Sequence, residues 1–231
     1  MDMSFMDKNI LEATIKDELA KINFISNPYS FTFIREKFGI SVFRIIHNEK
    51  SYVGKYFNNT QIRGRKEIKY YSLLESIGVP TIKMVAHTDC LILMEDLEKD
   101  SNYRHGKESD LTDPTIVRNI AKWFKLLHTN SRSYSRLDEL GYFSYSKREL
   151  TTENITNVME KSNYDDNELW NLLFNNLELL TKTFYRLCNT IIYTDFYWDN
   201  LAVALDNSSA VMFDYNCMNR GYAYADIRHT G

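Results

Sequence analysis

The sequence predicts an α+β fold, in which a strand-rich first part is followed by a mainly helical second part. Short aromatic and β-branched runs fill the first hundred residues. Longer segments with an apolar residue at every third or fourth position dominate afterwards. A short strand–turn–strand pattern then occupies residues 201–213. Strands and helices that are segregated along the chain, and do not alternate, are typical of α+β proteins.

The first part opens with a predicted amphipathic helix, because its apolar residues recur at intervals of four, four and three, at Leu11, Ile15, Leu19 and Ile22. Residues 30–58 contain three short runs separated by turns, which predict an antiparallel meander. Residues 61–80 predict a helix that ends at Gly78, just before Pro80. Two further runs within 81–100 complete a sheet of about five strands.

The second part begins after a polar, turn-rich segment at 101–113, so we predict two lobes, residues 1–97 and 98–231. Asp113 followed by Pro114 predicts the start of a helix that runs to about Leu127. A second helix is predicted within 166–188, and we expect it to be the central helix of this lobe. Short strands over 191–193, 201–205 and 210–213 predict a loop and a small hairpin.

Composition excludes several classes of protein. The formal net charge of −3 and the isoelectric point near 6.0 leave no basic field for a nucleic acid or an anionic membrane. Three widely spaced cysteines argue against a disulfide framework and structural zinc: Cys90, Cys188 and Cys217. The sequence contains no signal-like leader and no apolar stretch of membrane-spanning length. We therefore expect a cytoplasmic, soluble protein.

Three polar residues stand at the ends of the late strands. Asp195 and Asn200 bracket the loop before 201–205, and Asp214 follows the run at 210–213. A carboxylate beside a substrate hydroxyl can accept its proton, and an amide plus a second carboxylate are hard oxygen ligands for Mg²⁺. Each residue alone fits a turn cap or a strand end equally well. Their joint spacing favours phosphoryl transfer.

These motifs resemble those of the aminoglycoside phosphotransferase and choline kinase-like enzymes, in the stretches YTDFYWDN (193–200) and MFDYN (212–216). The resemblance implies a protein-kinase-like bilobal fold and a kinase that uses ATP (or GTP) and Mg²⁺ to phosphorylate a hydroxyl of a small molecule. Asp195 would then be the catalytic base or hydroxyl-orienting group. Asn200 and Asp214 would hold the metal.

The resemblance extends to the first lobe, where Lys55 would hold the nucleotide phosphates and Glu67 would be its ion-pair partner. Glu67 also stands out by spacing, because Tyr71 and Leu74 place it on an apolar helix face, where an unpaired carboxylate is costly. A buried Lys55–Glu67 pair removes that cost. The alternative is two solvated surface charges.

Three further segments match the family more weakly. The backbone around Glu95 and Leu97 would meet the adenine edge, as the hinge between lobes. Ser41, after Gly39, falls at the family's phosphate-covering turn, although this stretch also fits an ordinary hairpin. Asp226 would bind the backbone of the catalytic loop, which is a structural role.

Two departures from the family pattern leave alternatives open. Tyr193 stands where the family has a histidine, and only seventeen residues follow Asp214, where the family continues with helices that line the acceptor pocket. We therefore expect that C-terminal helices are missing or that the acceptor pocket is shallow or completed by a partner chain. The alternative function is a nucleotide-binding pseudokinase or scaffold. A metal-dependent hydrolase is a third reading, but the expected histidines are lacking.

Overall fold

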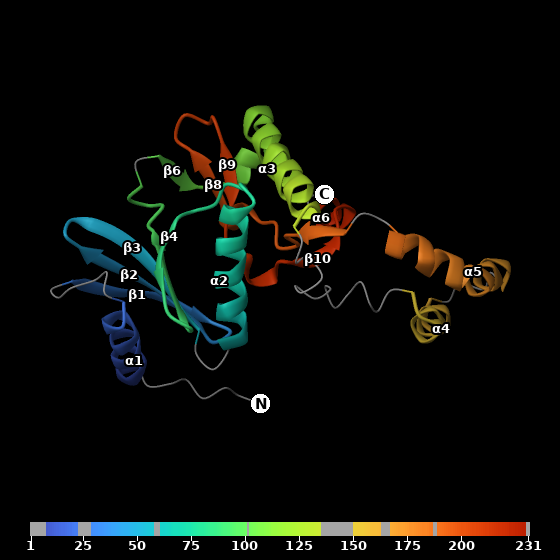
Figure 1. The fold of residues 1–231 in the computed structure, drawn as a ribbon, viewed down its shortest axis with the longest axis horizontal. Helices are drawn as coiled ribbons and strands as arrows, with labels where there is room; N and C mark the ends of the chain where they lie inside the picture. The colour runs from blue at the N-terminus through green and yellow to red at the C-terminus, as the bar shows by residue number, and fades with distance from the viewer. Residues whose placement is uncertain are drawn as a thin grey trace. The chain divides into compact units, whose positions relative to one another are not determined.

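The computed structural model describes residues 8–22, 29–57, 61–100, 102–134, 150–162, 167–186 and 189–229. The chain divides into two compact units. Figure 1 shows the helices and strands of both. The first unit comprises residues 1–125 and 197–217, and the second comprises 126–196 and 218–231. The lobe boundary at residues 97 and 98 stays a prediction.

A five-stranded antiparallel sheet with two helices forms the N-terminal part of the first unit, as the sequence predicts. Its strands follow the order β1-β2-β3-β5-β4. The elements are α1 (Lys8–Ala20), β1 (Ser30–Lys37), β2 (Ile40–His47), β3 (Lys50–Phe57), α2 (Gln61–Ser76), β4 (Met84–His87) and β5 (Leu91–Glu95). The predicted sheet of about five antiparallel strands and its helices are thereby confirmed.

Alternate side chains of the strands contact two different helices. On β3, Tyr52 and Tyr56 belong to the same buried cluster as the apolar stripe of α1, whereas Lys55 pairs with Glu67 of α2. On β5, Leu93 joins the α1 cluster and Met94 accepts a hydrogen bond from Tyr71 of α2. Because successive strand residues point to opposite faces, the two helices cover opposite faces of the sheet.

A glycine in the middle of this sheet makes room for the Phe43 ring of the α1 cluster. Gly54 on β3 lies directly opposite Phe43 on β2, whose side chain is fully buried. A Cβ atom at position 54 would stand 2.1 Å from Cζ of Phe43. The ring therefore occupies the space that any side chain at position 54 would need.

The first unit also contains the predicted late hairpin, together with a strand that was not predicted. Its elements are β6 (Tyr103–His105), a 3₁₀ turn (Glu108–Thr112), a second 3₁₀ turn (Trp198–Asn200), β8 (Leu201–Ala204), β9 (Ala210–Met212) and a third 3₁₀ turn (Tyr215–Cys217). β8 and β9 form the hairpin, and β6 adds to its other edge. Arg104 of β6 binds Asp110 through both guanidinium nitrogens, at 2.7 and 2.9 Å.

Helix α3 (Pro114–Arg132) begins at the predicted residue, because Asp113 Oδ1 accepts the backbone N–H of Thr115 at 2.7 Å. This start belongs to the first unit. The other elements of the second unit are α4 (Thr152–Lys161), α5 (Asn167–Arg186), β7 (Asn189–Ile192), β10 (Asn219–Tyr222) and α6 (Tyr224–His229). β7 pairs antiparallel with β10. No helix in the described part of the chain is both long and apolar enough to cross a membrane.

Helix α5 differs from the expected central helix. Trp170 is buried, but Leu172 and Leu179 are 60% and 63% exposed. Helix α4, which contacts α5, is short and was not predicted. A central helix has buried side chains on all of its faces. The described side chains of α5 do not meet this requirement.

We predict that Gly54→Ala destabilises the protein by about 1–3 kcal/mol, because the added methyl group overlaps the Phe43 ring. Urea denaturation of both proteins measures the difference. In a Phe43→Leu background the smaller side chain frees space, so the same substitution should cost less. An equal cost in the two backgrounds would show that Phe43 is not the obstacle.

Candidate active site

A buried lysine and glutamate form the centre of the candidate site. Lys55 lies on the central strand β3, between Val42 of β2 and Ile92 of β5. Its Nζ atom is 2.8 Å from Oε1 of Glu67, and Glu67 is fully buried on α2. The predicted ion pair is therefore confirmed, and the alternative of two solvated charges is wrong.

Asp214 joins this pair from the segment after β9. Its Oδ1 atom is 2.9 Å from Nζ of Lys55 and also accepts a hydrogen bond from the side chain of Asn216. Both contacts use Oδ1, so Oδ2 has no hydrogen bond among the described residues. The backbone at Asp214 has a φ of 64°, in the left-handed region that favours glycine.

The three charges set one another's ionisation. Burial disfavours the Lys55 ammonium, but the carboxylates of Asp214 and Glu67 outweigh this effect and raise its pKa. Burial also disfavours the Asp214 carboxylate, and Lys55 outweighs it, so that the pKa of Asp214 lies below its usual range. For Glu67, burial prevails over the attraction of Lys55 and raises the pKa to about 7.

Asn200 reaches the neighbourhood of Asp214 through the hairpin register. Leu201 of β8 pairs with Met212 of β9, and the N–H of Phe213 donates to the carbonyl of Asn200 at 3.0 Å. The backbone of Asn200 thus lies beside the residue that precedes Asp214. The two predicted metal ligands belong to the same end of the hairpin.

This donor set suits a metal that keeps water or substrate ligands. The described residues contain no group of three or more His, Cys, Asp or Glu side chains arranged to hold a metal ion. Mg²⁺ is commonly bound through one or two protein oxygens together with phosphate and water. A carboxylate with one unused oxygen and a neighbouring amide therefore fit Mg²⁺, and Asp214 and Asn200 are the residues that would hold it.

The predicted hinge is held by a residue that sequence reasoning did not single out. Asp96, between Glu95 and Leu97, is only 2% exposed. Its carboxylate accepts hydrogen bonds at 2.6 Å from both Nε of Arg44 and Oγ of Ser51. In the structure it ties this segment to β2 and β3.

The segment to which the resemblance assigns the phosphate-covering turn forms the hairpin turn between β1 and β2, with positive φ at Phe38 and Gly39. Phe38 is 67% exposed, whereas Ser41 is fully buried and its Oγ has no hydrogen-bond partner among the described residues. A role of Ser41 in nucleotide binding remains a prediction.

In the second unit, Asp226 of α6 holds the segment that leads to Asp195. Its Oδ1 atom accepts the backbone N–H groups of Tyr193 and Thr194 at 2.9 and 2.8 Å. Its Oδ2 atom lies 2.7 Å from Nε2 of His128 on α3. This is the structural role that the resemblance implies for Asp226. The contact with His128 was not predicted, and nothing in the local pattern around His128 signals it.

The predicted catalytic residue follows this anchored segment directly. Asp195 is half-buried and comes after Thr194, whose φ of 57° is unusual for a β-branched residue. Tyr193, at the position of the family histidine, is fully buried. Asp195 belongs to the second unit, whereas Lys55, Asn200 and Asp214 belong to the first. Its catalytic role remains a proposal.

Comparison of the sequence with protein-family models and with curated proteins gives no match. Solved structures do resemble the chain. An ethanolamine kinase from Plasmodium vivax has a TM-score of 0.63 at 14% identity, over 96% of this chain and 66% of that one. A choline kinase, LicA, from Streptococcus pneumoniae has a TM-score of 0.57 at 14% identity, over 96% and 74%.

A third similar structure is the spectinomycin phosphotransferase APH(9)-Ia in complex with ADP and spectinomycin. Its TM-score is 0.56 at 14% identity, over 97% of this chain and 73% of that one. At these identities the likeness establishes the fold. The chain has the protein-kinase-like α+β fold of the aminoglycoside phosphotransferases and of the choline and ethanolamine kinases. It spans just under two thirds of the ethanolamine kinase.

We predict that Glu67 makes stability depend on pH near neutrality. Its pKa in the folded protein, about 7, is above the ordinary value of 4.5, so the folded state holds the Glu67 proton more tightly than the unfolded state. The contribution of Glu67 should therefore decrease as pH rises from 4.5 to 7. Relative to Glu67→Gln, which does not titrate, the wild type should lose on the order of 1–3 kcal/mol between pH 5 and pH 8.

Urea denaturation of both nucleotide-free proteins at pH 5, 6, 7 and 8 measures this difference. Asp214 does not interfere, because its lowered pKa places its titration below this range. Parallel pH profiles for wild type and Glu67→Gln would contradict the prediction.

Proposed function

We propose that the protein is a phosphotransferase that uses ATP (or GTP) and Mg²⁺ to phosphorylate a hydroxyl group of a small molecule. The observation that carries the proposal is the buried Lys55 ammonium, bound at 2.8 Å by Glu67 and at 2.9 Å by Asp214. A strand lysine, a helix glutamate and an aspartate after a hairpin are the arrangement that kinases use to bind a nucleotide phosphate and its metal.

The proposed roles follow from the contacts of each residue. Lys55, fixed on its strand and by Glu67, would bind the nucleotide phosphates. Asp214, through its unused Oδ2, and Asn200 would hold Mg²⁺, which supplies positive charge to neutralise the phosphates. Asp195 would accept the proton of the acceptor hydroxyl or orient that hydroxyl.

The adenine base would be bound by the backbone around Glu95 and Leu97. Asp96 supports this role, since its bonds to Arg44 and Ser51 fix the segment without using the side chains of its two neighbours. The small-molecule acceptor follows from the similar structures, which are named as ethanolamine, choline and spectinomycin kinases. A cytoplasmic location is consistent with Cys90 and Cys217, neither of which forms a disulfide among the described residues.

A nucleotide-binding pseudokinase is the second candidate, and Tyr193 favours it. The family histidine is replaced by a tyrosine that is fully buried. Calorimetric titration with ATP, with and without Mg²⁺, followed by measurement of ATP consumption with a panel of amino alcohols, aminoglycosides and sugars, separates the two. A kinase consumes ATP with at least one acceptor, whereas a pseudokinase binds the nucleotide without turnover.

We predict that Asp214→Asn removes most of the Mg²⁺ dependence of nucleotide binding while the protein remains folded. The amide loses the charge that both Lys55 and a metal need, whereas the residue lies outside the apolar core. Comparison of ATP affinity at saturating and at zero Mg²⁺ measures the effect. Asp206→Asn, at an exposed carboxylate of the β8–β9 turn, is the control and should retain the full dependence. An unchanged Mg²⁺ dependence in Asp214→Asn would remove Asp214 from the metal site.

We predict that Asp195→Asn lowers turnover by roughly two to four orders of magnitude and leaves ATP affinity nearly unchanged. The amide keeps the shape of the side chain but cannot accept the hydroxyl proton. A purely structural Asp195 predicts a different result, in which stability falls by about 0.5–2 kcal/mol and affinity and turnover weaken together. Melting temperature, ATP affinity and turnover, measured on the same variant, distinguish the two, and normal turnover would exclude the catalytic role.

A further inference from the structure

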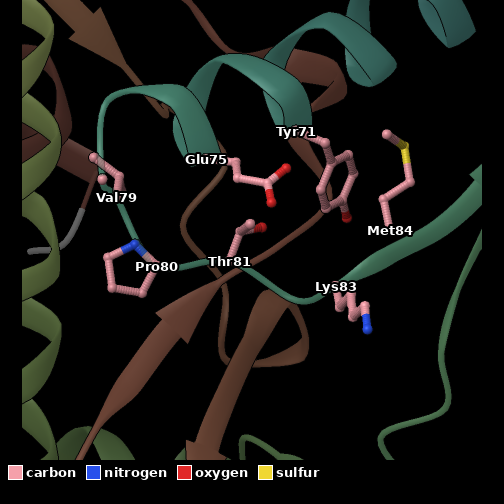
Figure 2. A pocket seen from close by; sticks show the side chains of 8 residues that line it. Tyr71, Glu75, Val79, Pro80, Thr81, Lys83 and Met84 are labelled. Atoms are coloured by element: carbon pink, nitrogen blue, oxygen red, sulfur yellow. The ribbon is translucent and has the colours of Figure 1, made fainter.

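A cavity of about 370 Å³ lies at the C-terminal end of α2, in the first unit. Figure 2 shows that its walls come from the last turns of α2, the connecting loop and the start of β4. They comprise Tyr71, Glu75, Gly78, Val79, Pro80, Thr81, Lys83 and Met84. None of these residues belongs to the proposed nucleotide or metal site. A volume of this size is typical of small-molecule pockets.

The walls of this cavity are fixed by contacts on their far side. The ring of Tyr71 packs against Tyr215 with centroids 4.6 Å apart, and its hydroxyl donates to the sulfur of Met94. In the loop, the carbonyl of Pro80 accepts the indole N–H of Trp123 at 2.7 Å. The cavity is therefore a preformed pocket and does not depend on rearrangement of the loop.

The hydroxyl groups of Thr81 and Tyr215 form a hydrogen bond whose direction decides what Thr81 can offer to a ligand. The Tyr215 hydroxyl donates its single hydrogen to the carbonyl of Met212 at 2.5 Å. In its 2.6 Å contact with Thr81 it must therefore accept, so Thr81 is the donor. The carbonyl of Ile82, at 3.4 Å, is the more distant of the two acceptors for this single hydrogen. With its hydrogen used inside the protein, the Thr81 hydroxyl can only accept a hydrogen bond from a ligand.

Glu75 supplies the second acceptor. Its carboxylate has no hydrogen bond and no ion pair among the described residues, and the side chain is exposed to the cavity. In Figure 2 this carboxylate lies between Tyr71 and Thr81. Two acceptors, one of them charged, stand beside the apolar surfaces of Val79, Pro80 and Met84.

Lys83 is the one cation in the lining. In Figure 2 its ammonium points away from the Glu75 carboxylate, and the two side chains form no ion pair in the described part of the chain. Its positive charge repels a cationic ligand. It does not neutralise the Glu75 carboxylate by direct contact. The pocket therefore presents two acceptors together with one cation whose side chain points away from them.

We propose that this pocket is a binding site for a small amine, whose protonated nitrogen donates to Glu75 and Thr81 and whose apolar body contacts Val79, Pro80 and Met84. The match is between donors on the ligand and acceptors on the protein, in a partly enclosed site where charge-assisted hydrogen bonds are strong. The proposal does not depend on the phosphotransferase function, because no residue of the nucleotide site takes part.

The test uses benzylamine as the probe, with benzyl alcohol, benzoate and benzyltrimethylammonium as matched ligands. Titration of the nucleotide-free protein, followed by amide NMR, should show benzylamine shifting the signals of residues 75–84. Benzyl alcohol lacks the charge, benzoate reverses it, and benzyltrimethylammonium keeps the charge without an N–H donor, so all three should bind at least about tenfold more weakly. Equal binding by any of them would overturn the proposal.

Substitutions locate the site. Glu75→Gln should weaken benzylamine binding about tenfold or more, since it removes the charged acceptor from an exposed position and leaves the fold intact. Lys83→Met should strengthen binding a few-fold by removing the opposing charge. Asp17→Asn, at an exposed carboxylate on α1, should leave the affinity unchanged. Retention of full affinity in Glu75→Gln would refute the assignment.

Discussion

The Lys55 ammonium pairs with two carboxylates of the first unit that are removed from water. Glu67 is fully buried and the Asp214 side chain is 19% exposed, so neither is well solvated. An uncompensated charge of this kind costs about 3–5 kcal/mol when its partner is removed. Strand β3, helix α2 and the segment after β9 meet at this cation, and their mutual positions depend on it.

The scaffold explains why this cation can be held so firmly. β3 is flanked by β2 and β5, so the backbone of Lys55 is fixed on both edges. The Phe43 ring packs over Gly54, the neighbour of Lys55, on the face of the sheet that α1 covers. Because side chains alternate along the strand, Lys55 lies on the opposite face and contacts Glu67 of α2. The second unit uses the reverse arrangement, in which one buried carboxylate, Asp226, collects two backbone N–H groups and an imidazole.

Local patterns predicted the elements that depend on local physics. The period of α1, the alternation in β2 and β3 and the glycine after α2 are properties of short windows, and each of these elements is present. The three-residue strand β6 was missed because Tyr103–His105 is polar and too short to show alternation. It exists because it pairs with β8, about a hundred residues later.

In the candidate site, too, some features could be predicted from short stretches of sequence, whereas others depend on contacts between distant segments. Spacing indicated that Glu67 needs a partner, because a lone carboxylate on an apolar helix face is costly, and the family resemblance supplied Lys55 as that partner. The contacts of Asp96 with Arg44 and of His128 with Asp226 join residues 52 and 98 positions apart. Such pairings depend on how elements pack, and no periodicity within either segment reports them. The role of Asp226 itself came from the family resemblance.

The left-handed backbone at Thr194 and at Asp214 carries a conformational cost at two points of the chain. Both positions have a φ near 60°, which costs a side chain roughly 1–2 kcal/mol and costs glycine nothing. A chain selected for stability alone would carry glycine or asparagine there. An aspartate and a β-branched threonine stand there instead, so the backbone cost falls on Asp214 itself and directly before Asp195, the residues proposed for the metal and for the acceptor hydroxyl.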